Sequence, residues 1–399
     1  MTYLENIVYL DNSSTTLPCD EAIKEINSAL SRDFGNPSSL HTLGFNAEKR
    51  VTSARQAVAD MLCAIPDEIY FTSGGTEGNN TALSGAAYAR RKRGNRIVTT
   101  AIEHPSVLEV VKRLESEGFE VIRIKPAPDG TISEEDIFAA VNDKTILVSI
   151  MLVNNETGAI LPVSAARRAI DKAGAPAILH CDAVQAFGKM PINAKTLGAD
   201  IITASAHKIH GPKGVGFLYI NEGTKINPVI FGGGQQKGMR SGTENVPGIA
   251  GMSRAAEMIY DSLEDNIQKL FELKSYFIRE LLALSDVTVN GLPEDFAKDP
   301  DAAVQRTAPH IVSASFANVR AEVLLHALEA KGIYVSSGSA CSSNRPAKSK
   351  TLTAIGIDQK LLDSTLRFSM SVETTKEEID ETLEVLSKEL PGLRRYMRR

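Results

Sequence analysis

The feature that most constrains the fold is an alternation of short, almost entirely apolar runs with helical segments through the first two-thirds of the chain. Strands that alternate with helices form a mostly parallel sheet with helices on both faces, and strands buried on both faces are apolar throughout. The expected strands are Ile69–Phe71, Arg96–Thr100, Glu120–Ile124, Thr145–Met151, Ala177–Cys181, Asp200–Thr203 and Gly216–Ile220. The expected helices between them include Thr76–Arg93, Ser106–Glu117, Ser133–Val141 and Val163–Ala173. We therefore expect an α/β fold with a mostly parallel seven-stranded sheet.

The pattern changes from about Val246 onward. A long helical stretch is expected to continue to about Leu284, before a strand at Val287–Asn290 and a polar loop over residues 291–307. The remaining expected elements are strands at His310–Phe316, Ile333–Val335 and Leu366–Met370 and helices at Ala321–Lys331 and about Thr375–Glu389. A chain of 399 residues is long enough for two cores. We expect a large α/β domain of residues 15–260 and a smaller α+β domain formed by residues 1–14 and 261–399.

Composition excludes several classes of protein. The formal net charge of −5 gives no overall attraction to nucleic acid or to an anionic membrane. No apolar run approaches the ~20 residues that cross a bilayer, and Met1–Asn6 lack the pattern of a secretory signal. We expect a cytoplasmic protein with neither nucleic acid nor membrane as a direct partner. The basic C-terminal end, residues 394–399, is expected to be a solvated tail.

Four cysteines in so long a chain make no disulfide framework, and none forms a C-x-x-C pair, so we expect no bound metal. Cys63 ends an expected helix and Cys181 ends an apolar strand, and both are expected to be buried as small hydrophobic residues. Cys19, beside a proline, is expected to have a structural role in a turn. Cys341 stands in a different context, a small and polar run.

Ligands bind at the carboxyl ends of the strands in such sheets, so the loops that follow the strands are the ones to examine. The segment Thr72–Asn79 lies between a strand and a helix and contains three glycines. Glycines let the backbone approach an anion closely, and a helix start offers unpaired N–H groups. The spacing fits neither a dinucleotide fingerprint nor a P-loop. Taken alone, the segment is either a phosphate-binding turn or a glycine-rich helix start without a ligand.

Two further loops carry an acid and a lysine. Asp182 ends an apolar strand, where it can pair with a cationic heterocyclic nitrogen or cap a helix. Lys208 follows another strand between two histidines, and a lysine in a site that excludes water loses its proton more easily and can form a Schiff base. Pyridoxal phosphate needs a lysine for its aldehyde, an acid for its pyridine nitrogen and a nest for its phosphate. The three clusters together therefore indicate this cofactor.

Other motifs extend along nearly the whole chain. They stand at Tyr9–Thr16, Gly35–His41, Glu103-His104, Val153–Gly158, Asp182–Gln185, His207–Gly214, Arg240–Asn245, Ser336–Cys341 and Leu366–Ser369. With these motifs the chain resembles the cysteine desulfurases of the NifS/IscS type, in the class V aminotransferase branch of the fold-type I pyridoxal-phosphate enzymes. The lysine and cysteine motifs, in this order, are highly specific for that family.

The resemblance implies a role for each matching residue. Lys208 carries the cofactor and later moves protons, Asp182 pairs with the pyridine nitrogen, and His104 stacks on the ring and serves in acid–base steps. Other cofactor contacts are implied for Asn155, for Gln185 at the phenolic oxygen, and for Gly75, Thr76, Ser205 and His207 at the phosphate. Thr243 resembles the residue that reaches this phosphate from a partner subunit, which implies a homodimer. Asn155 and Arg367 are expected to bind the substrate carboxylate, for which the rigid fork of arginine is suited.

By the same resemblance, the enzyme converts L-cysteine to L-alanine and leaves a persulfide on Cys341. The thiolate is the nucleophile in such a step. Residues 336–344 are small and polar and are expected to form a mobile loop that carries the sulfur to an acceptor or scaffold protein. The sulfur would serve iron–sulfur cluster assembly or tRNA thiolation.

The chain departs from the family at two places near these motifs. Ser13 and Ser14 stand where the family usually has two alanines, and Ser371-Val372 stands where Gly-Arg is common. Residues 342–350 are also more basic than usual. The alternatives are a selenocysteine lyase, another class V aminotransferase, which would leave Cys341 without a task, and a non-catalytic sulfur-transfer docking subunit. The last is disfavoured because every expected cofactor contact is present.

Overall fold

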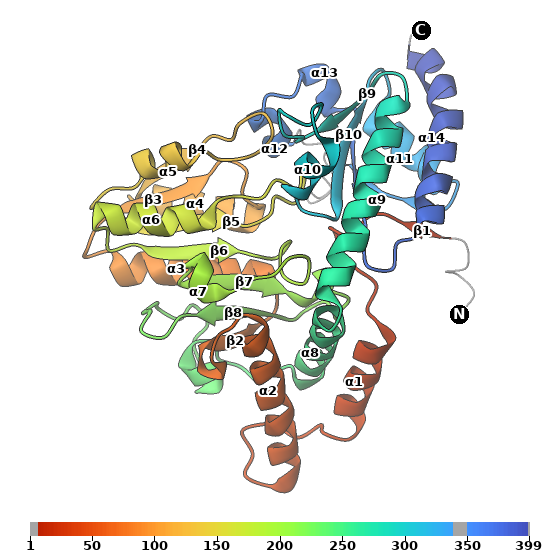
Figure 1. The fold of residues 1–399 in the computed structure, drawn as a ribbon. Coiled ribbons are helices and arrows are strands. Elements are labelled where there is room, and N and C mark those ends of the chain that lie inside the picture. Colours follow the sequence, from red (N-terminus) through yellow and green to blue (C-terminus); the bar gives the residue numbers. More distant parts are fainter. Residues whose placement is uncertain (1–6, 338–348, 398–399) are drawn as a thin grey trace.

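The computed structural model describes residues 7–337 and 349–397, and its centre is a seven-stranded sheet (Figure 1). The strands are β2 (Ile69–Thr72), β3 (Arg96–Thr100), β4 (Glu120–Ile124), β5 (Thr145–Met151), β6 (Ile178–Asp182), β7 (Ile201–Ser205) and β8 (Gly216–Ile220). They lie in the order β2-β8-β7-β6-β5-β3-β4. Strands β7, β6, β5, β3 and β4 are parallel, whereas β8 is antiparallel to both of its neighbours. The predicted mostly parallel sheet of seven strands is confirmed.

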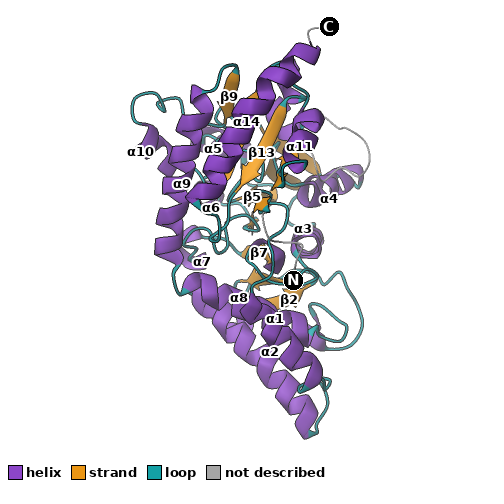
Figure 2. Cartoon of the chain, turned by 90° about the vertical axis from the view of Figure 1, so that its right-hand side faces the viewer, coloured by secondary structure: helices purple, strands orange, loops and turns teal. Residues whose placement is uncertain are grey.

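Helices cover both faces of this sheet, and each face has its own core. These helices are α1 (Asp20–Ser31), α2 (Thr42–Met61), α3 (Gly75–Arg90), α4 (Pro105–Ser116), α5 (Glu134–Ala140), α6 (Val163–Ala173), α7 (Ala194–Leu197) and α8 (Val246–Tyr260). Along β3, Ile97 belongs to the core of one face and Val98 to that of the other, because successive side chains of a strand alternate in direction. Helices α1, α2 and α8 pack together at one end of the molecule (Figure 2).

A second, antiparallel sheet lies beside the first. It has the order β12-β13-β10-β9, with β9 (Val287–Asn290), β10 (Ile311–Phe316), β12 (Ser336–Ser337) and β13 (Thr365–Ser369). The remaining elements are β1 (Val8–Tyr9), which pairs with β11 (Ile333–Tyr334), and α9 (Leu263–Ala283), α10 (Pro300–Gln305), α11 (Ala321–Glu329), α12 (Lys350–Ala354), α13 (Gln359–Leu362) and α14 (Lys376–Met397). Phe368 is central to the core here, with its ring centroid 5.1 Å from that of Phe277 and 6.2 Å from that of Phe316. The domain division at residues 14/15 and 260/261 stays a prediction.

Two predictions about helices in the second half are wrong. The stretch from Val246 to Leu284 is not one helix but two, α8 and α9, which are separated at Ser262, where the backbone has φ −133° and ψ 30°. Serine favours helix ends because its side chain competes for backbone hydrogen bonds. The polar loop 291–307 contains the short helix α10, whose start is fixed by Pro300 and by a hydrogen bond of 3.1 Å from the Ala302 N–H to the Asp299 carboxylate.

The chain ends differ from the prediction as well. Helix α14 continues to Met397 instead of ending near Glu389. Arg394 lies in its last turns and donates hydrogen bonds to the carbonyl oxygens of Ser285 (2.8 Å) and Ala317 (3.2 Å), so the predicted solvated tail is wrong for this residue. The guanidinium of Arg394 therefore connects the end of α14 to the loops beside β9 and β10. No helix among the residues described is both long and apolar enough to cross a membrane.

The four cysteines differ in their surroundings. Cys181 is fully buried in β6, as predicted. Cys63 is exposed, so the prediction of a buried residue is wrong: α2 ends at Met61, and Cys63 adopts a left-handed conformation with φ 54°. Leu62 fills the core position beside it. Cys19 is partly exposed just before α1, and Cys341 lies outside the described residues.

Candidate active site

A cavity of about 470 Å³ opens where the parallel strands of the large sheet end. Its walls include ten of the residues predicted for the site: Gly75, Thr76, His104, Asn155, Asp182, Gln185, Ser205, His207, Lys208 and Arg367. The carboxyl ends of parallel strands are the usual place for a ligand in an open α/β sheet. Thr243 is exposed and is not part of the wall. Cys341 cannot be placed, since it lies outside the described part of the chain.

Lys208 is held above the end of β7 by the N-terminal segment. It is the last residue of a short 3₁₀ helix, Ala206–Lys208, that follows the strand directly. Its ammonium donates hydrogen bonds to the carbonyl oxygens of Ser13 and Ser14, the latter at 2.8 Å. The loop is fixed in turn by Thr16, whose N–H donates to the His207 carbonyl oxygen over 2.8 Å. Residues 13–16 and the lysine loop therefore form one wall.

Asp182 is presented rigidly at the end of β6. One carboxylate oxygen accepts a hydrogen bond from the Asn79 amide (2.7 Å) and the other accepts one from the Val184 N–H (3.0 Å). Asn79 also donates to Ser106 Oγ over 2.9 Å. The segment after Asp182 forms a turn instead of a helix, so the alternative of a helix cap is wrong. A fixed carboxylate at the cavity wall suits a cationic partner.

His104 is the N-cap residue of α4. Its Nδ1 accepts a hydrogen bond from the Ser106 N–H at 3.2 Å, so this nitrogen is unprotonated and Nε2 carries the hydrogen of the neutral ring. Burial lowers the pKa of His104, and the nearby Lys208 lowers it further, while Asp182 acts in the opposite direction. A neutral imidazole in this orientation is suited to lie against an aromatic ring and to donate a hydrogen bond from Nε2.

The glycine-rich segment forms a nest for an anion at the start of α3. Gly74 is the N-cap with φ 137°, and no side chain caps the helix, so the first N–H groups stand at the cavity with the positive end of the helix dipole. A Cβ on Gly75 would lie 2.8 Å from Val184 Cγ2, so a larger residue does not fit there. The Ser205 hydroxyl lies close by, 3.4 Å from the place of a Cβ on Gly74.

His207 completes this end of the cavity. Burial lowers the pKa of His207 to about 4, and Lys208 and Lys213 act in the same direction. Its buried Nδ1 has no hydrogen-bond partner among the described residues. An uncapped helix start, a serine hydroxyl and an unpartnered imidazole nitrogen are the donor set that a phosphate group requires.

Gln185 joins the cavity to a buried histidine that the sequence did not indicate. Its amide nitrogen donates to the Ser13 carbonyl oxygen at 2.9 Å, and its Oε1 lies 3.4 Å from His310 Nε2. Burial holds the pKa of His310 well below its ordinary value, so the ring is neutral. His310 was expected only as the first residue of a strand, and Asn79 only as the last residue of the glycine-rich segment.

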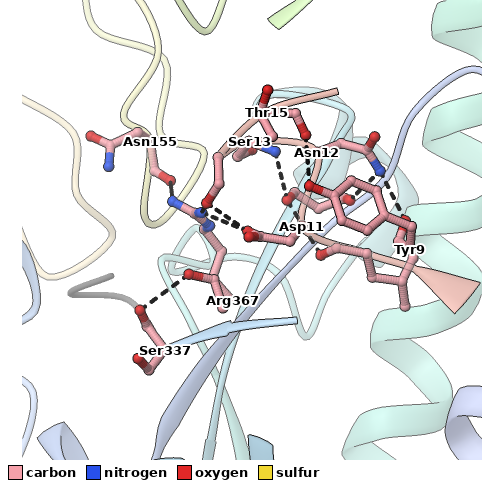
Figure 3. A network of polar contacts seen from close by, with 12 residues as sticks. Tyr9, Asp11, Asn12, Ser13, Thr15, Asn155, Ser337 and Arg367 are labelled. Carbon is pink, nitrogen blue, oxygen red and sulfur yellow. Dashed lines mark hydrogen bonds and ion pairs between the residues drawn. The ribbon is translucent and has the colours of Figure 1, made fainter. Parts of the chain in front are cut away.

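The opposite end of the cavity is an ionic network around Arg367 (Figure 3). This arginine lies within β13 and its side chain is 6% exposed. One terminal nitrogen, Nη1, donates to the Asn155 carbonyl oxygen at 2.9 Å. The other, Nη2, donates to Asp11 Oδ1 at 3.0 Å and to Ser14 Oγ at 2.7 Å. The side chain of Asn155 itself extends away from the guanidinium (Figure 3).

Comparisons with known proteins agree with this geometry. The family described as Aminotransferase class-V matches residues 8–382. The cysteine desulfurase IscS of Dictyoglomus turgidum is 40% identical over 97% of this chain and 95% of its own. A solved structure named as a NifS-like protein has a TM-score of 0.89 and 37% identity, covering 97% of this chain and all of its own. Another, SspA in complex with cysteine, has a TM-score of 0.77 and 29% identity, covering 92% of this chain and 99% of its own. The chain therefore belongs to the class V aminotransferase family, among the cysteine desulfurases of the NifS/IscS type.

Proposed function

We propose that this chain is a pyridoxal-phosphate-dependent cysteine desulfurase that converts L-cysteine to L-alanine and receives the sulfur on Cys341. The observation that carries the proposal is that one cavity brings together Lys208, Asp182, an uncapped helix start and Arg367. These are a Schiff-base lysine, an acid for a pyridine nitrogen, a phosphate nest and a carboxylate anchor. The names of the relatives support the same activity.

The residues present fit the cofactor. The start of α3 with Ser205 and His207 would hold the phosphate, and Asp182 would hold the protonated ring nitrogen. Gln185 would face the phenolic oxygen, His104 would lie against the ring, and Lys208 would bind the aldehyde. When bound, pyridoxal phosphate supplies an electron sink for bonds broken at the substrate carbon atoms.

The chain's own residues bind the substrate and move its protons. Arg367 offers a planar fork for the amino-acid carboxylate. Lys208 Nζ is positioned by two carbonyl oxygens at the cavity wall and would transfer protons at the α carbon of the substrate. His104, kept neutral by burial, would present its Nε2–H to the arriving substrate as a hydrogen-bond donor, because its acceptor nitrogen Nδ1 is engaged by the Ser106 N–H.

Cys341 lies outside the described residues, but the residues on either side of its segment are placed. Ser336 pairs with Arg367 across β12 and β13. After the segment, the Ser349 hydroxyl donates a hydrogen bond of 2.5 Å to the carboxylate of Glu156, the residue that follows Asn155. The described residues Ser336 and Ser349, which precede and follow residues 338–348 in the chain, thus lie beside the carboxylate end of the cavity. This placement supports Cys341 as the group that meets the substrate sulfur.

The proposed sulfur transfer balances without an external oxidant. The Cys341 thiolate attacks the sulfur of the bound cysteine, a sulfur–sulfur bond forms, and the bond between Cβ and sulfur breaks. The electron pair of that bond would remain with the carbon framework, for which bound pyridoxal phosphate would supply the electron sink, and a proton would then add at Cβ to give alanine. Sulfur is oxidised to the persulfide level while the carbon is reduced. A reducing compartment such as the cytoplasm suits this thiolate.

We also propose a homodimer that delivers sulfur to an acceptor or scaffold protein, for iron–sulfur cluster assembly or tRNA thiolation. Large apolar side chains are exposed at Leu17, Phe34, Leu40, Phe45 and Phe231. Large apolar side chains that are exposed in one chain are groups that a subunit interface would bury. Thr243, exposed and outside its own cavity, is free to complete the site of a partner subunit.

The proposal is tested by measuring alanine and sulfide from L-cysteine in the presence of a thiol reductant. Wild type should give both in equal amounts. Cys341→Ala should keep the visible absorbance of the bound cofactor and lose alanine formation. Cys63→Ala, which removes an exposed thiol elsewhere, is the matched control and should behave as wild type. Alanine formation by Cys341→Ala at the wild-type rate would show that another class V reaction is the activity.

A further inference from the structure

Ser14 links three functional parts of the cavity. Its hydroxyl donates to Asp11 Oδ1 over 2.7 Å and accepts a hydrogen bond from Arg367 Nη2, also over 2.7 Å. Its carbonyl oxygen accepts a hydrogen bond from the Lys208 ammonium over 2.8 Å. Both Ser14 and Arg367 line the cavity, whereas Asp11 is not part of the wall. The hydroxyl therefore stands at the front of the ion pair, on the side from which a substrate arrives.

The neighbouring serine has no such position. Ser13 is buried, and its hydroxyl has no hydrogen-bond partner among the described residues. Its carbonyl oxygen, like that of Ser14, accepts from Lys208, but this contact does not depend on the side chain. Both serines replace residues that are usually alanine in the family, yet only the hydroxyl of Ser14 enters the ionic network.

On the basis of the proposed function, we propose that Ser14 is a positioning residue that sets the affinity of this enzyme for the carboxylate of its substrate. It holds Nη2 of Arg367 at the cavity wall, so that the guanidinium presents an ordered edge to a carboxylate. A planar fork that is already ordered loses less side-chain entropy when a carboxylate binds. Buried Arg367 Nε has no hydrogen-bond partner among the described residues, so the present contacts do not satisfy the whole guanidinium.

The hydroxyl also weakens the competition from Asp11. This carboxylate already pairs with Arg367 at 3.0 Å, and a substrate carboxylate must share or displace that contact. The Ser14 hydroxyl donates one of the hydrogen bonds that the Asp11 carboxylate can accept. Without the hydroxyl, Asp11 would depend more strongly on Arg367. Both effects make carboxylate binding weaker when the hydroxyl is removed.

The test compares two ligands that differ only in the carboxylate, L-alanine and ethylamine, on the cofactor-loaded enzyme by calorimetry. Ser14→Ala should raise the dissociation constant of L-alanine about tenfold, the effect of losing one hydrogen bond to a charged group. The dissociation constant of ethylamine should stay within about twofold, since no carboxylate is involved. Ser14→Thr, which retains a hydroxyl, should restore most of the affinity for L-alanine. Ser13→Ala is the matched control and should keep the wild-type ratio of the two constants.

Two results would overturn the inference: no change for either ligand in Ser14→Ala, or equal weakening of both, which would indicate a general structural role. A wild type without any preference for L-alanine over ethylamine would overturn it as well. The proposed function fails separately, through the absence of alanine from L-cysteine. In that event a carboxylate preference that depends on Ser14 would still stand.

Discussion

The two ends of the cavity are built in different ways. At the cofactor end, Asp182 ends β6 and Lys208 comes shortly after the neighbouring strand β7, and the hydrogen-bonded ladder between these strands sets their relative position. At the carboxylate end, Arg367 contacts Asn155 and Asp11, which are 212 and 356 positions away in the chain. The first end is mainly a product of strand order, and the carbonyl oxygens of Ser13 and Ser14 add the contacts at Lys208. The second exists only when both sheets and the N-terminal segment have come together.

The electrostatics differ between the ends as well. The histidines of the cofactor end are neutral, because burial lowers the pKa of His104 and brings that of His207 to about 4. At the carboxylate end, a nearly buried arginine is paired with a carboxylate. A buried ion pair that loses one member leaves an uncompensated charge, which is costly. We therefore expect substitutions at the cofactor end to affect chemistry and those at the carboxylate end to affect binding.

The largest effect is expected for Lys208→Ala at the cofactor end. Alanine formation from L-cysteine should fall about 10³-fold or more, because the variant lacks both the aldehyde-binding amine and the group that moves the proton. The phosphate nest is intact, so the variant should still bind pyridoxal phosphate, with the absorbance of the free aldehyde. Visible spectra and the initial rate measure the two effects. Lys213→Ala, at the rim of the same cavity, should keep the wild-type spectrum. A Lys208→Ala enzyme with an undiminished rate would contradict the assignment of chemistry to this end.

A smaller effect of a different kind is expected for Arg367→Lys at the carboxylate end. An ammonium cannot reproduce the two parallel hydrogen bonds of a guanidinium to a carboxylate. The KM for L-cysteine should rise about 50-fold while kcat changes by less than about fivefold, the result of losing binding common to ground state and transition state. Steady-state kinetics measure both constants, with the exposed Arg320→Lys as the control. If kcat falls as much as kcat/KM, the division between chemistry and binding is wrong.

The smallest effect concerns the support behind the carboxylate end. Buried Lys274 donates from Nζ to Thr307 Oγ1 (2.6 Å) and to the Ala308 carbonyl oxygen (2.7 Å). The Ala308 N–H in turn donates to the carbonyl oxygen of Gly158, which is three positions after Asn155 in the chain. Burial lowers the pKa of Lys274 to about 7, from an ordinary value of 10.5 in the unfolded chain.

Between these two pKa values the unfolded chain binds more protons, so stability rises with pH in this window. From pH 7 to pH 9, wild type should gain about 2 kcal/mol relative to Lys274→Met, which lacks the titrating group. Thermal unfolding midpoints of both proteins at the two pH values measure this gain. A constant difference between the two proteins across this range would show that Lys274 does not titrate there.

That these residues lie around one cavity could be predicted from the sequence, because they lie at the ends of apolar strands and strand order in a parallel sheet brings such ends together. The role of Asn79 could not be predicted, since it depends on the side of α3 that faces Asp182. The role of His310 depends on packing against Gln185, 125 positions away. The pairing of Arg367 with Asp11 has no local pattern at all. Cys63 was wrongly expected to be buried. Its exposure follows from its own left-handed conformation just after a helix, which the sequence pattern does not reveal.

The pairing of the two chain ends has a consequence for synthesis. Val8 and Tyr9 pair with Ile333 and Tyr334, and the Ser13 N–H donates to the Ser369 hydroxyl. The N-terminal segment is synthesised first, but its partner strands are among the last to be made. The large sheet between them in the sequence can form earlier. Contacts so distant in the chain close slowly. The carboxylate end of the cavity would therefore be the last part to form, after the large sheet has brought Asp182 and Lys208 close together.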